Sequence, residues 1–166
     1  MAIGNSSLLP PPSIAPLTAE IDPPLHVFGF QIDVLSPSEV AGHLRVTDIC
    51  CQPFKKLHGG VSALIAEALA SMGAVVASGF RRVAGVQLSI NHLGSAAAGD
   101  LVLARAVPLK SGEVIQIWEV CLWVMNQTTM EKETLISSSK VSIFCNMSVP
   151  ENAKRDIISF KKYAKL

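Results

Sequence analysis

The stretch from Leu57 to Gly79, with the sequence LHGGVSALIAEALASMGAVVASG, decides the fold of this chain. Its larger apolar residues recur at three- and four-residue spacing, which is the period of an α-helix that buries one face. These residues are Val61, Leu64, Ile65, Ala68, Leu69, Met72, Val75 and Val76. The other face carries no Lys, Arg, Asp or Gln. A helix that is apolar all round is either a core helix or a membrane span.

Glu67 is the only charged residue in this stretch. A step of 100° per residue places small residues on the same side of the helix, so there is room beside the carboxylate. The small residues are Gly60, Ala63, Ala70, Ser71 and Ala74. An ionised carboxylate in such a place costs on the order of several kcal/mol unless a partner or a reaction uses it. Glu67 is therefore the candidate chemical centre, and the alternative is a structural carboxylate held by backbone N–H groups or an Arg.

A membrane span is the second alternative for the stretch, because its length is close to the roughly 20 residues that a bilayer needs. The composition argues against this alternative. The stretch is rich in Ala, Gly and Ser, it holds Glu67 near its middle, and amphipathic strands follow it. We therefore predict a core helix and no membrane span.

The composition of the 166 residues fits one globular domain, with 49% hydrophobic and 16% charged residues. A formal net charge of +1, without a long run of either sign, gives no electrostatic footprint for nucleic acid or for an anionic membrane. The low charged fraction and the high apolar fraction suggest that another subunit covers part of the apolar surface. The four cysteines lack the spacing of a zinc site, so we expect no metal and no cofactor.

The two ends of the chain differ from its middle. Residues 1–25 hold six of the ten prolines, which predicts an extended, flexible leader. This leader lacks the basic start and the apolar core of a secretory signal. Residues 26–149 form the predicted domain, and residues 150–166 form a polar tail.

Alternating apolar and polar residues predict six strands within the domain. Two strands, at 28–34 and 43–47, come before the helix and form a hairpin. Four come after it, at 86–92, 101–109, 113–127 and 135–147. Both faces of the 101–127 hairpin carry apolar residues, which predicts central strands covered on two sides. The connections between strands three to six are short, so these neighbours are predicted to be antiparallel. The fold class is α+β.

The residues around the helix start resemble those of a known family. The run His58-Gly59-Gly60 has Gln52 before it and Ala63, Ala66-Glu67 and Ala70-Ser71 after it. This pattern resembles the 4-hydroxybenzoyl-CoA thioesterase branch of the hotdog superfamily, which includes small aryl-CoA thioesterases of menaquinone and enterobactin pathways. The resemblance covers residues 28–147, and residues 89–93 look like the strand that follows the helix in that family. It implies a hotdog fold, in which a curved antiparallel sheet of about six strands wraps a long central helix.

The resemblance also implies an activity and roles for single residues. It implies hydrolysis of an aromatic acyl-CoA at a site between two subunits, in a homodimer or a dimer-of-dimers tetramer. Glu67 would be the nucleophile, through a mixed anhydride, or the general base on a water. The N–H of Gly59 would stabilise the oxyanion at the positive end of the helix. Gln52 and His58 would position the carbonyl and the water, and Ser71 would orient the carboxylate.

Each accessory residue also has a structural interpretation. Gly59 and Gly60 suit a sharp turn into a helix, His58 suits a hydrogen bond at the helix start, and Ser71 suits ordinary helix surface. Their joint spacing favours function. Contacts to the CoA are less defined, because Gly94-Ser95 stands where the family often has Arg-Pro. The candidates for contacts to pantetheine or nucleotide are His92, Lys110, Ser111, Gly112 and Ser138, whereas His26 and His43 are expected on the surface.

The chain ends in Ala164-Lys165-Leu166, a small-basic-leucine tripeptide that resembles the peroxisomal S-K-L address. We therefore expect a peroxisomal protein that an import receptor recognises through this tripeptide. Two other functions stay open from the sequence. One is a broad-range fatty or benzoyl-CoA thioesterase, and the other is a non-catalytic module that binds acyl-CoA.

Overall fold

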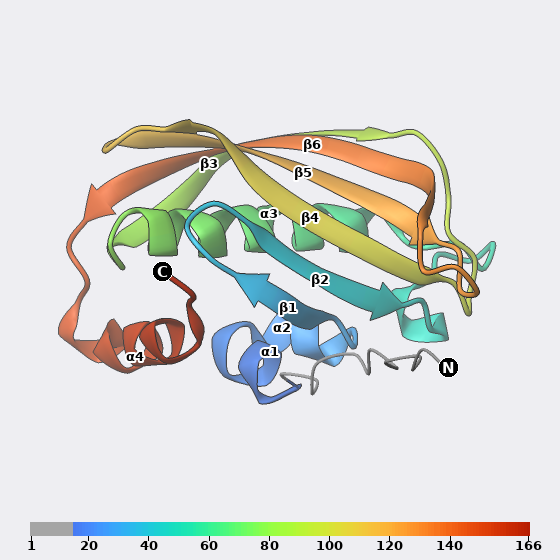
Figure 1. The fold of residues 1–166 in the computed structure, drawn as a ribbon, viewed down its shortest axis with the longest axis horizontal. Coiled ribbons are helices and arrows are strands. Elements are labelled where there is room, and N and C mark those ends of the chain that lie inside the picture. Colours follow the sequence, from blue (N-terminus) through green and yellow to red (C-terminus); the bar gives the residue numbers. More distant parts are fainter. Residues whose placement is uncertain (1–14) are drawn as a thin grey trace, which may run out of the picture.

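A computed structural model describes residues 15–166, in which one long helix lies against one antiparallel sheet (Figure 1). The helix is α3, Gly59–Ala77. The strands are β1 Gln31–Leu35, β2 Val40–Arg45, β3 Arg82–His92, β4 Leu101–Ser111, β5 Ile115–Met125 and β6 Lys132–Met147. They form a six-stranded sheet in the order β1-β2-β4-β5-β6-β3, with every pair antiparallel. The predicted α+β hotdog fold is confirmed.

Helix α3 begins where a side chain satisfies its first turn. The Nδ1 atom of His58 accepts a hydrogen bond from the N–H of Gly60 at 2.8 Å, which caps the helix. The helix ends before Gly79, whose φ of +74° favours glycine. It is the one helix within residues 15–166 that is long and apolar enough to span a membrane, and 67% of its apolar window is buried inside the fold. The predicted core helix is thus confirmed.

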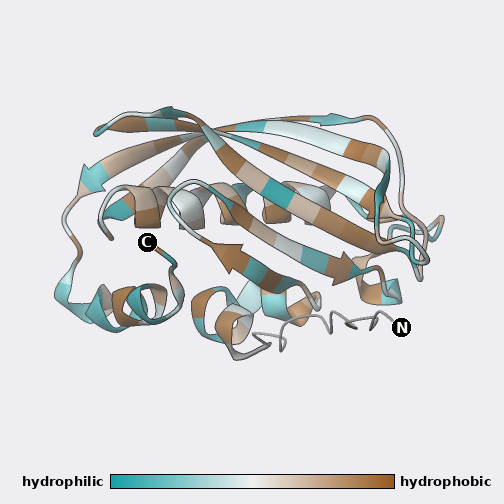
Figure 2. Cartoon of the chain, viewed as in Figure 1, coloured by the Kyte–Doolittle hydropathy of each residue, from teal (hydrophilic) through white to brown (hydrophobic). Residues whose placement is uncertain are grey.

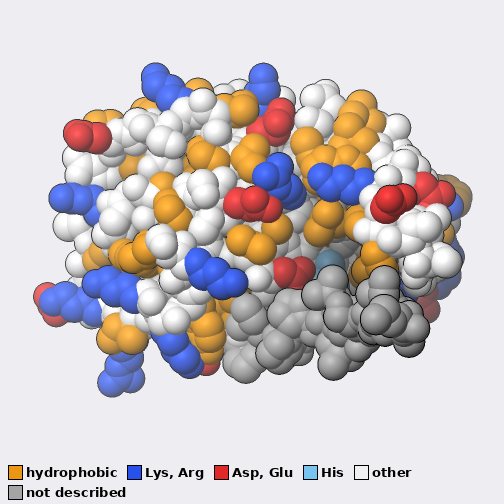
Figure 3. Space-filling view, viewed as in Figure 1, with side chains coloured by type: hydrophobic (Ala, Val, Ile, Leu, Met, Phe, Trp, Pro, Cys, Tyr) orange, Lys and Arg blue, Asp and Glu red, His pale blue; other side chains and the backbone are white. Residues whose placement is uncertain are grey.

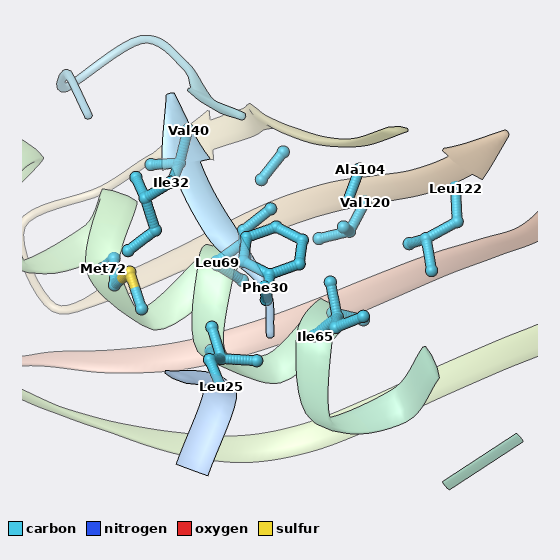
Figure 4. Close-up of a cluster of buried hydrophobic side chains, with 14 of the residues drawn as sticks. Leu25, Phe30, Ile32, Val40, Ile65, Leu69, Met72, Ala104, Val120 and Leu122 are labelled. Atoms are coloured by element: carbon cyan, nitrogen blue, oxygen red, sulfur yellow. The ribbon is translucent and has the colours of Figure 1, made fainter. Parts of the chain in front are cut away.

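The core lies between α3 and the concave face of the sheet, where apolar colours predominate (Figure 2). Ile65, Leu69 and Met72 of α3 meet side chains of β1, of the central strands and of the N-terminal segment (Figure 4). Trp118 of β5 is fully buried, and a Cβ placed on Gly73 would lie only 2.4 Å from its ring. The helix therefore packs onto the sheet at van der Waals contact.

The hairpin at residues 101–127 is buried on one face only in this chain. Trp118, Val120 and Leu122 point into the core with no exposed surface. On the other face, Ile117 is partly exposed and Ile115 is exposed. The prediction that these strands are covered on both sides is therefore wrong for the single chain.

The order of the strands differs from the prediction in one respect. Strand β3 pairs with β6, and β4 pairs with β2, so β3 and β4 are not neighbours. The connection 93–100 carries the chain across the end of the sheet. Its Gly94 N–H donates to the carbonyl of Ile136 on β6, and its Gly99 N–H donates to the carbonyl of Val46 beyond β2. These hydrogen bonds at the two ends of one loop explain how a short connection joins distant strands.

The predicted extended leader is wrong for residues 15–25. These residues form α1, Ala15–Ile21, and the start of α2, Pro23–Val27. The two prolines stand at the first positions of α2, where a missing N–H costs nothing, and the Asp22 carboxylate accepts from the N–H of Leu25 at 3.0 Å. Leu17 and Leu25 are buried. Because α2 runs to Val27, β1 begins at Gln31 and not at 28, and residues 1–14 lie outside the described part of the chain.

The tail at 150–166 is also ordered. It forms the 3-10 turn η2, Glu151–Ala153, and helix α4, Lys154–Tyr163, which lies beside α1. The hydroxyl of Tyr163 donates to Glu20 on α1 at 2.9 Å, and the N–H of Lys165 donates to the carbonyl of Leu35 on β1 at 2.9 Å. Basic side chains cover the outer surface of α4 at the lower left of Figure 3. The tail is thus polar outside and attached to the domain inside.

Candidate functional site

Glu67 lies midway along α3 and is half-buried. The hydroxyl of Ser71, one turn later, donates to its Oε1 atom at 2.8 Å. Within residues 15–166 no Lys, Arg or His forms an ion pair with Glu67, and no backbone N–H bonds to it. The structural alternative, a carboxylate neutralised by Arg or held by the backbone, has no support in the described chain. Ser71 donates to Oε1, and no donor among residues 15–166 bonds to Oε2.

A glycine on the neighbouring strand makes room for this carboxylate. A Cβ placed on Gly85 of β3 would lie 2.7 Å from Oε1 of Glu67, closer than real contacts allow. The strand is irregular here, because the pairing with β6 shifts between Gly85 and Gln87. A cavity of about 250 Å³ opens beside the carboxylate. Its lining consists of Glu67, Gly85, Val86, Gln87, Leu88 and Val141. The carboxylate therefore borders open space as well as protein.

The start of α3 provides hydrogen-bond donors. Gly59 is the first helical residue, and its N–H is one of those that have no partner inside a helix. The aligned peptide dipoles make this end of the helix positive. His92, at the end of β3, packs over this glycine, since a Cβ on Gly59 would lie 3.1 Å from Nε2 of His92. Gly59 is thus an open N–H donor with an imidazole beside it.

His58, directly before Gly59, adds a side-chain donor, and Gln52 adds another in the loop that leads to α3. Because Nδ1 of His58 accepts from the N–H of Gly60, the neutral imidazole carries its hydrogen on Nε2 and can donate from there. The carbonyl oxygen of Gln52 accepts from the N–H of Phe54, which leaves its NH₂ group as a donor. The structural role predicted for His58, a hydrogen bond at the helix start, is present, and it fixes which nitrogen can donate.

The donors and the carboxylate form two separate groups in one chain. We call Gln52, His58 and Gly59 the donor group, and Glu67 with Ser71 the carboxylate group. Glu67 follows Gly59 by eight positions, which corresponds to about 12 Å along a helix. A reacting carbonyl must lie about 3 Å from both its oxyanion donors and its nucleophile. One chain therefore places His58 beside Gly59 and Ser71 beside Glu67, but it does not bring Gly59 and Glu67 together.

The five candidates for CoA contacts are scattered. His92 lies at the start of α3, whereas Ser111 and Gly112 line a cavity of about 360 Å³ at its far end, next to the exposed Lys110. Ser138 faces away from the core between the buried Ser137 and Ser139. The sequence reasoning missed Arg81 in that far cavity, whose guanidinium donates to Asn146 at 2.7 Å. The available signal was its place in the pair Arg81-Arg82, four positions after Ala77, the last residue of α3.

A third cavity borders the donor group and was also missed. It measures about 320 Å³. Its lining consists of Phe28, Ile49, Cys51, His58, Gly60, Val61 and Leu64. Ile49 lies in the 3-10 turn η1, Asp48–Cys50, where no periodic pattern marks a buried or functional residue. Only its exposure, 60% for an isoleucine, distinguishes it, and exposure is a property of the fold.

Comparison with known proteins agrees with these features. A family model described as thioesterase superfamily matches residues 54–131. The chain is 54% identical to 1,4-dihydroxy-2-naphthoyl-CoA thioesterase 2 of Arabidopsis thaliana over 81% of this chain and 86% of that protein. It is 36% identical to 1,4-dihydroxy-2-naphthoyl-CoA hydrolase of Listeria monocytogenes, over 69% of this chain and 89% of that one.

Solved structures share the fold. AziG of S. sahachiroi matches with a TM-score of 0.68 at 25% identity, over 78% of this chain and 99% of that one. The protein smu.793 of Streptococcus mutans, solved with bound acetyl CoA, matches with a TM-score of 0.63 at 17% identity, over 73% of this chain and 91% of that one.

Proposed function

Because this chain belongs to the thioesterase superfamily, we propose that it hydrolyses 1,4-dihydroxy-2-naphthoyl-CoA to 1,4-dihydroxy-2-naphthoate and CoA. The observation that carries the substrate is the 54% identity with the Arabidopsis thaliana thioesterase of that name, which extends over most of both chains. The observation that carries the chemistry is the half-buried Glu67, with one oxygen held by Ser71 and a cavity beside it.

The donor group binds and polarises the thioester. The N–H of Gly59 donates to the carbonyl oxygen and stabilises the negative charge that develops there, because the positive helix end and the fixed donor need no reorganisation. The Nε2–H of His58 and the NH₂ of Gln52 are donors that orient the carbonyl or the attacking water. Removal of one oxyanion donor from other enzymes costs on the order of 100- to 1000-fold in rate.

Glu67 supplies the reacting carboxylate in one of two ways. As a general base, it takes a proton from water while the water oxygen attacks the carbonyl carbon. As a nucleophile, its Oε2 attacks that carbon and forms a mixed anhydride, which water then hydrolyses. In both routes the C–S bond breaks, and the CoA thiolate leaves and takes up a proton. A thiolate is a good leaving group, so the chain needs no further acid.

We propose that two chains complete each site, with the donor group of one chain facing the carboxylate group of the other. The distance of about 12 Å between the groups in one chain supports this. Strand β3 offers an interface, because it is an edge strand without a charged residue between Val83 and Asn91. Uncharged edges of this length pair readily with another chain. The assembly is a homodimer or a dimer of dimers.

A CoA-release assay tests the proposed activity. The assay uses 1-hydroxy-2-naphthoyl-CoA, an analogue of the proposed substrate that lacks the 4-hydroxyl group. We expect the wild-type protein to hydrolyse this analogue faster than benzoyl-CoA and palmitoyl-CoA. The change Glu67→Gln lowers the rate at least about a hundredfold and leaves substrate binding intact. Glu133→Gln, an exposed carboxylate that lines none of the three cavities, is the matched control with unchanged rate. Preference for palmitoyl-CoA would identify a broad-range enzyme, and no hydrolysis of any thioester would identify a binding module.

Subunit mixing tests the shared site. A Glu67→Ala protein and a Gln52→Ala/His58→Ala protein are each expected to be inactive. Under conditions of subunit exchange, mixed dimers contain one site with both groups intact, so partial activity returns. If native mass spectrometry confirms mixed dimers and no activity returns, the two groups do not act across subunits.

We further propose that the protein acts in peroxisomes, in phylloquinone biosynthesis, and that an import receptor binds the last three residues. The resemblance of Ala164-Lys165-Leu166 to the S-K-L address supports this, as does the 91% exposure of Leu166. A fluorescent protein fused at the N-terminus should enter peroxisomes and lose this location when the tripeptide is deleted. An unchanged distribution after deletion would refute the proposal.

A further inference from the structure

We propose that the cavity between Phe28, Ile49 and Leu64 holds the second ring of the naphthoyl group, and that Ile49 selects bicyclic over monocyclic acyl groups. We call it the distal-ring pocket, with the lining given above. The inference rests on the proposed function, because it assigns part of the same site.

The position of the pocket connects it to the reacting carbonyl. His58 and Gly60 line it, and these residues flank Gly59, the proposed oxyanion donor. If the carbonyl oxygen of the acyl group accepts from the N–H of Gly59, a naphthalene ring system attached to that carbonyl is therefore long enough to reach this pocket. No other cavity described for residues 15–166 borders the donor group.

The chemistry of the pocket fits an arene. Its walls are mainly apolar, from Phe28, Ile49, Val61 and Leu64, and its polar groups lie on the side of the donor group. Its volume of about 320 Å³ lies at the lower end of the range for small-molecule pockets, roughly 300–1,000 Å³. Burial of an aromatic ring against these side chains is favourable in proportion to the apolar area removed from water.

The cavity beside Glu67 is the rival location for the ring, and its chemistry is less suitable. It exposes the carboxylate of Glu67 and the amide of Gln87. The face of an aromatic ring carries negative partial charge, so a carboxylate against that face is unfavourable. We therefore assign the ring to the distal-ring pocket of one chain and the reacting water to the cavity beside Glu67 of the other chain.

The outer wall of the pocket is fixed in place although Ile49 itself is 60% exposed. Cys50, the next residue, is fully buried, and its thiol donates to the carbonyl of Phe28 at 3.4 Å. This contact ties η1 to the end of α2, so Ile49 and Phe28 form two walls with a set spacing. An exposed isoleucine on an anchored turn adds little to stability, which makes a role in substrate contact testable.

The test measures kcat/KM of the full-length protein with three thioesters: 1-hydroxy-2-naphthoyl-CoA, benzoyl-CoA and butyryl-CoA. The change Ile49→Ala should lower kcat/KM for the naphthoyl substrate about tenfold, the size that a lost contact in an apolar pocket produces. Benzoyl-CoA should lose less, and butyryl-CoA should change less than about twofold. The change Ile49→Trp, which fills the pocket, should abolish the preference for the bicyclic substrate.

Ile158→Ala is the matched control, because Ile158 is an exposed isoleucine (64%) on α4 that lines none of the three cavities, whereas Val86→Ala probes the rival cavity, which Val86 (61% exposed) lines. If Val86→Ala lowers naphthoyl hydrolysis selectively and Ile49→Ala does not, the ring lies beside Glu67 and the inference is wrong. Equal loss for all three thioesters in Ile49→Ala would also overturn it. Failure of the proposed function looks different, because then the wild-type protein itself hydrolyses no aromatic thioester.

Discussion

The change Gly85→Ala would displace the Glu67 carboxylate, the proposed reacting group, without changing any residue of α3. The added Cβ would lie 2.7 Å from Oε1 of Glu67, whereas ordinary contacts begin near 3.4 Å. The carboxylate must therefore move by about 0.7 Å, and this movement also strains its 2.8 Å hydrogen bond from Ser71. A misplacement of about 1 Å in a reacting group can cost about a hundredfold in rate. We expect kcat to fall between about ten- and a hundredfold.

The assay compares CoA release and thermal stability for Gly85→Ala and for Ser89→Ala, an exposed change on the same strand. Gly85 is exposed, and alanine restricts the unfolded chain more than glycine does, so Tm should stay within about 2 °C of the wild-type value. The expected signature is a loss of kcat with native stability. Wild-type kcat in a natively folded Gly85→Ala protein would refute the assignment of Glu67 as the reacting group in this position.

Two further predictions concern stability. A Cβ on Gly73 would overlap the ring of Trp118, and the overpacking cost of about 1–3 kcal/mol exceeds the gain of about 1 kcal/mol in helix propensity. Gly73→Ala should therefore lower the Tm measured by circular dichroism by several degrees. An unchanged Tm would contradict this packing. Nδ1–H of His43 donates to the Asp33 carboxylate at 2.7 Å, and this hydrogen bond raises the pKa of His43. The pair therefore stabilises the fold below the unfolded pKa near 6.5 and loses that effect as pH rises through the raised folded pKa. The difference in Tm between wild type and Asp33→Asn should therefore shrink from pH 6 to pH 8, and a difference that grows over this interval would contradict the assignment.

The helix and its carboxylate could be predicted because their signals are local. A period of three to four residues within 57–79 requires a helix, and one charge inside an apolar helix requires a function or a partner. The structure adds that no cation among residues 15–166 pairs with Glu67 and that Ser71 is its donor. The hydrogen bond from Gly60 to His58 likewise follows from adjacent residues. The helix, its cap and the hydrogen bond from Ser71 to Glu67 all form within one short segment of the sequence.

The features that could not be predicted depend on contacts between distant segments. Prolines in 15–25 suggested an extended chain, but tertiary burial of Leu17 and Leu25 and the cap by Asp22 make this segment helical. The pairing of β3 with β6 depends on the connection 93–100, which hydrogen bonds hold at both ends. The approach of Gly85 to Glu67 joins residues whose relation appears only when β3 lies beside α3.

His43 shows the same limit. The sequence placed it on the surface, whereas the structure shows it half-buried with Asp33 across the β1–β2 pair. The prediction that His26 is exposed is confirmed. Asp33 lies at an irregularity in the β1–β2 register between Ile32 and Val34, and no sequence pattern marks either the irregularity or the contact with His43.

The attachment of the last residues to β1 has a consequence for how a binding partner can read the end of the chain. A receptor that takes the final tripeptide as an extended peptide must first displace two backbone hydrogen bonds, from Lys165 to the carbonyl of Leu35 and from Ala164 to the carbonyl of Phe160, and the packing of Ala164 against the core. One such bond contributes about 1 kcal/mol net, against roughly 5–15 kcal/mol for a whole domain. The terminal residues can therefore detach while the sheet, α3, the donor group and the carboxylate group stay folded. A receptor could therefore bind the last three residues while the rest of the protein stays folded, so recognition of this end does not require the protein to unfold.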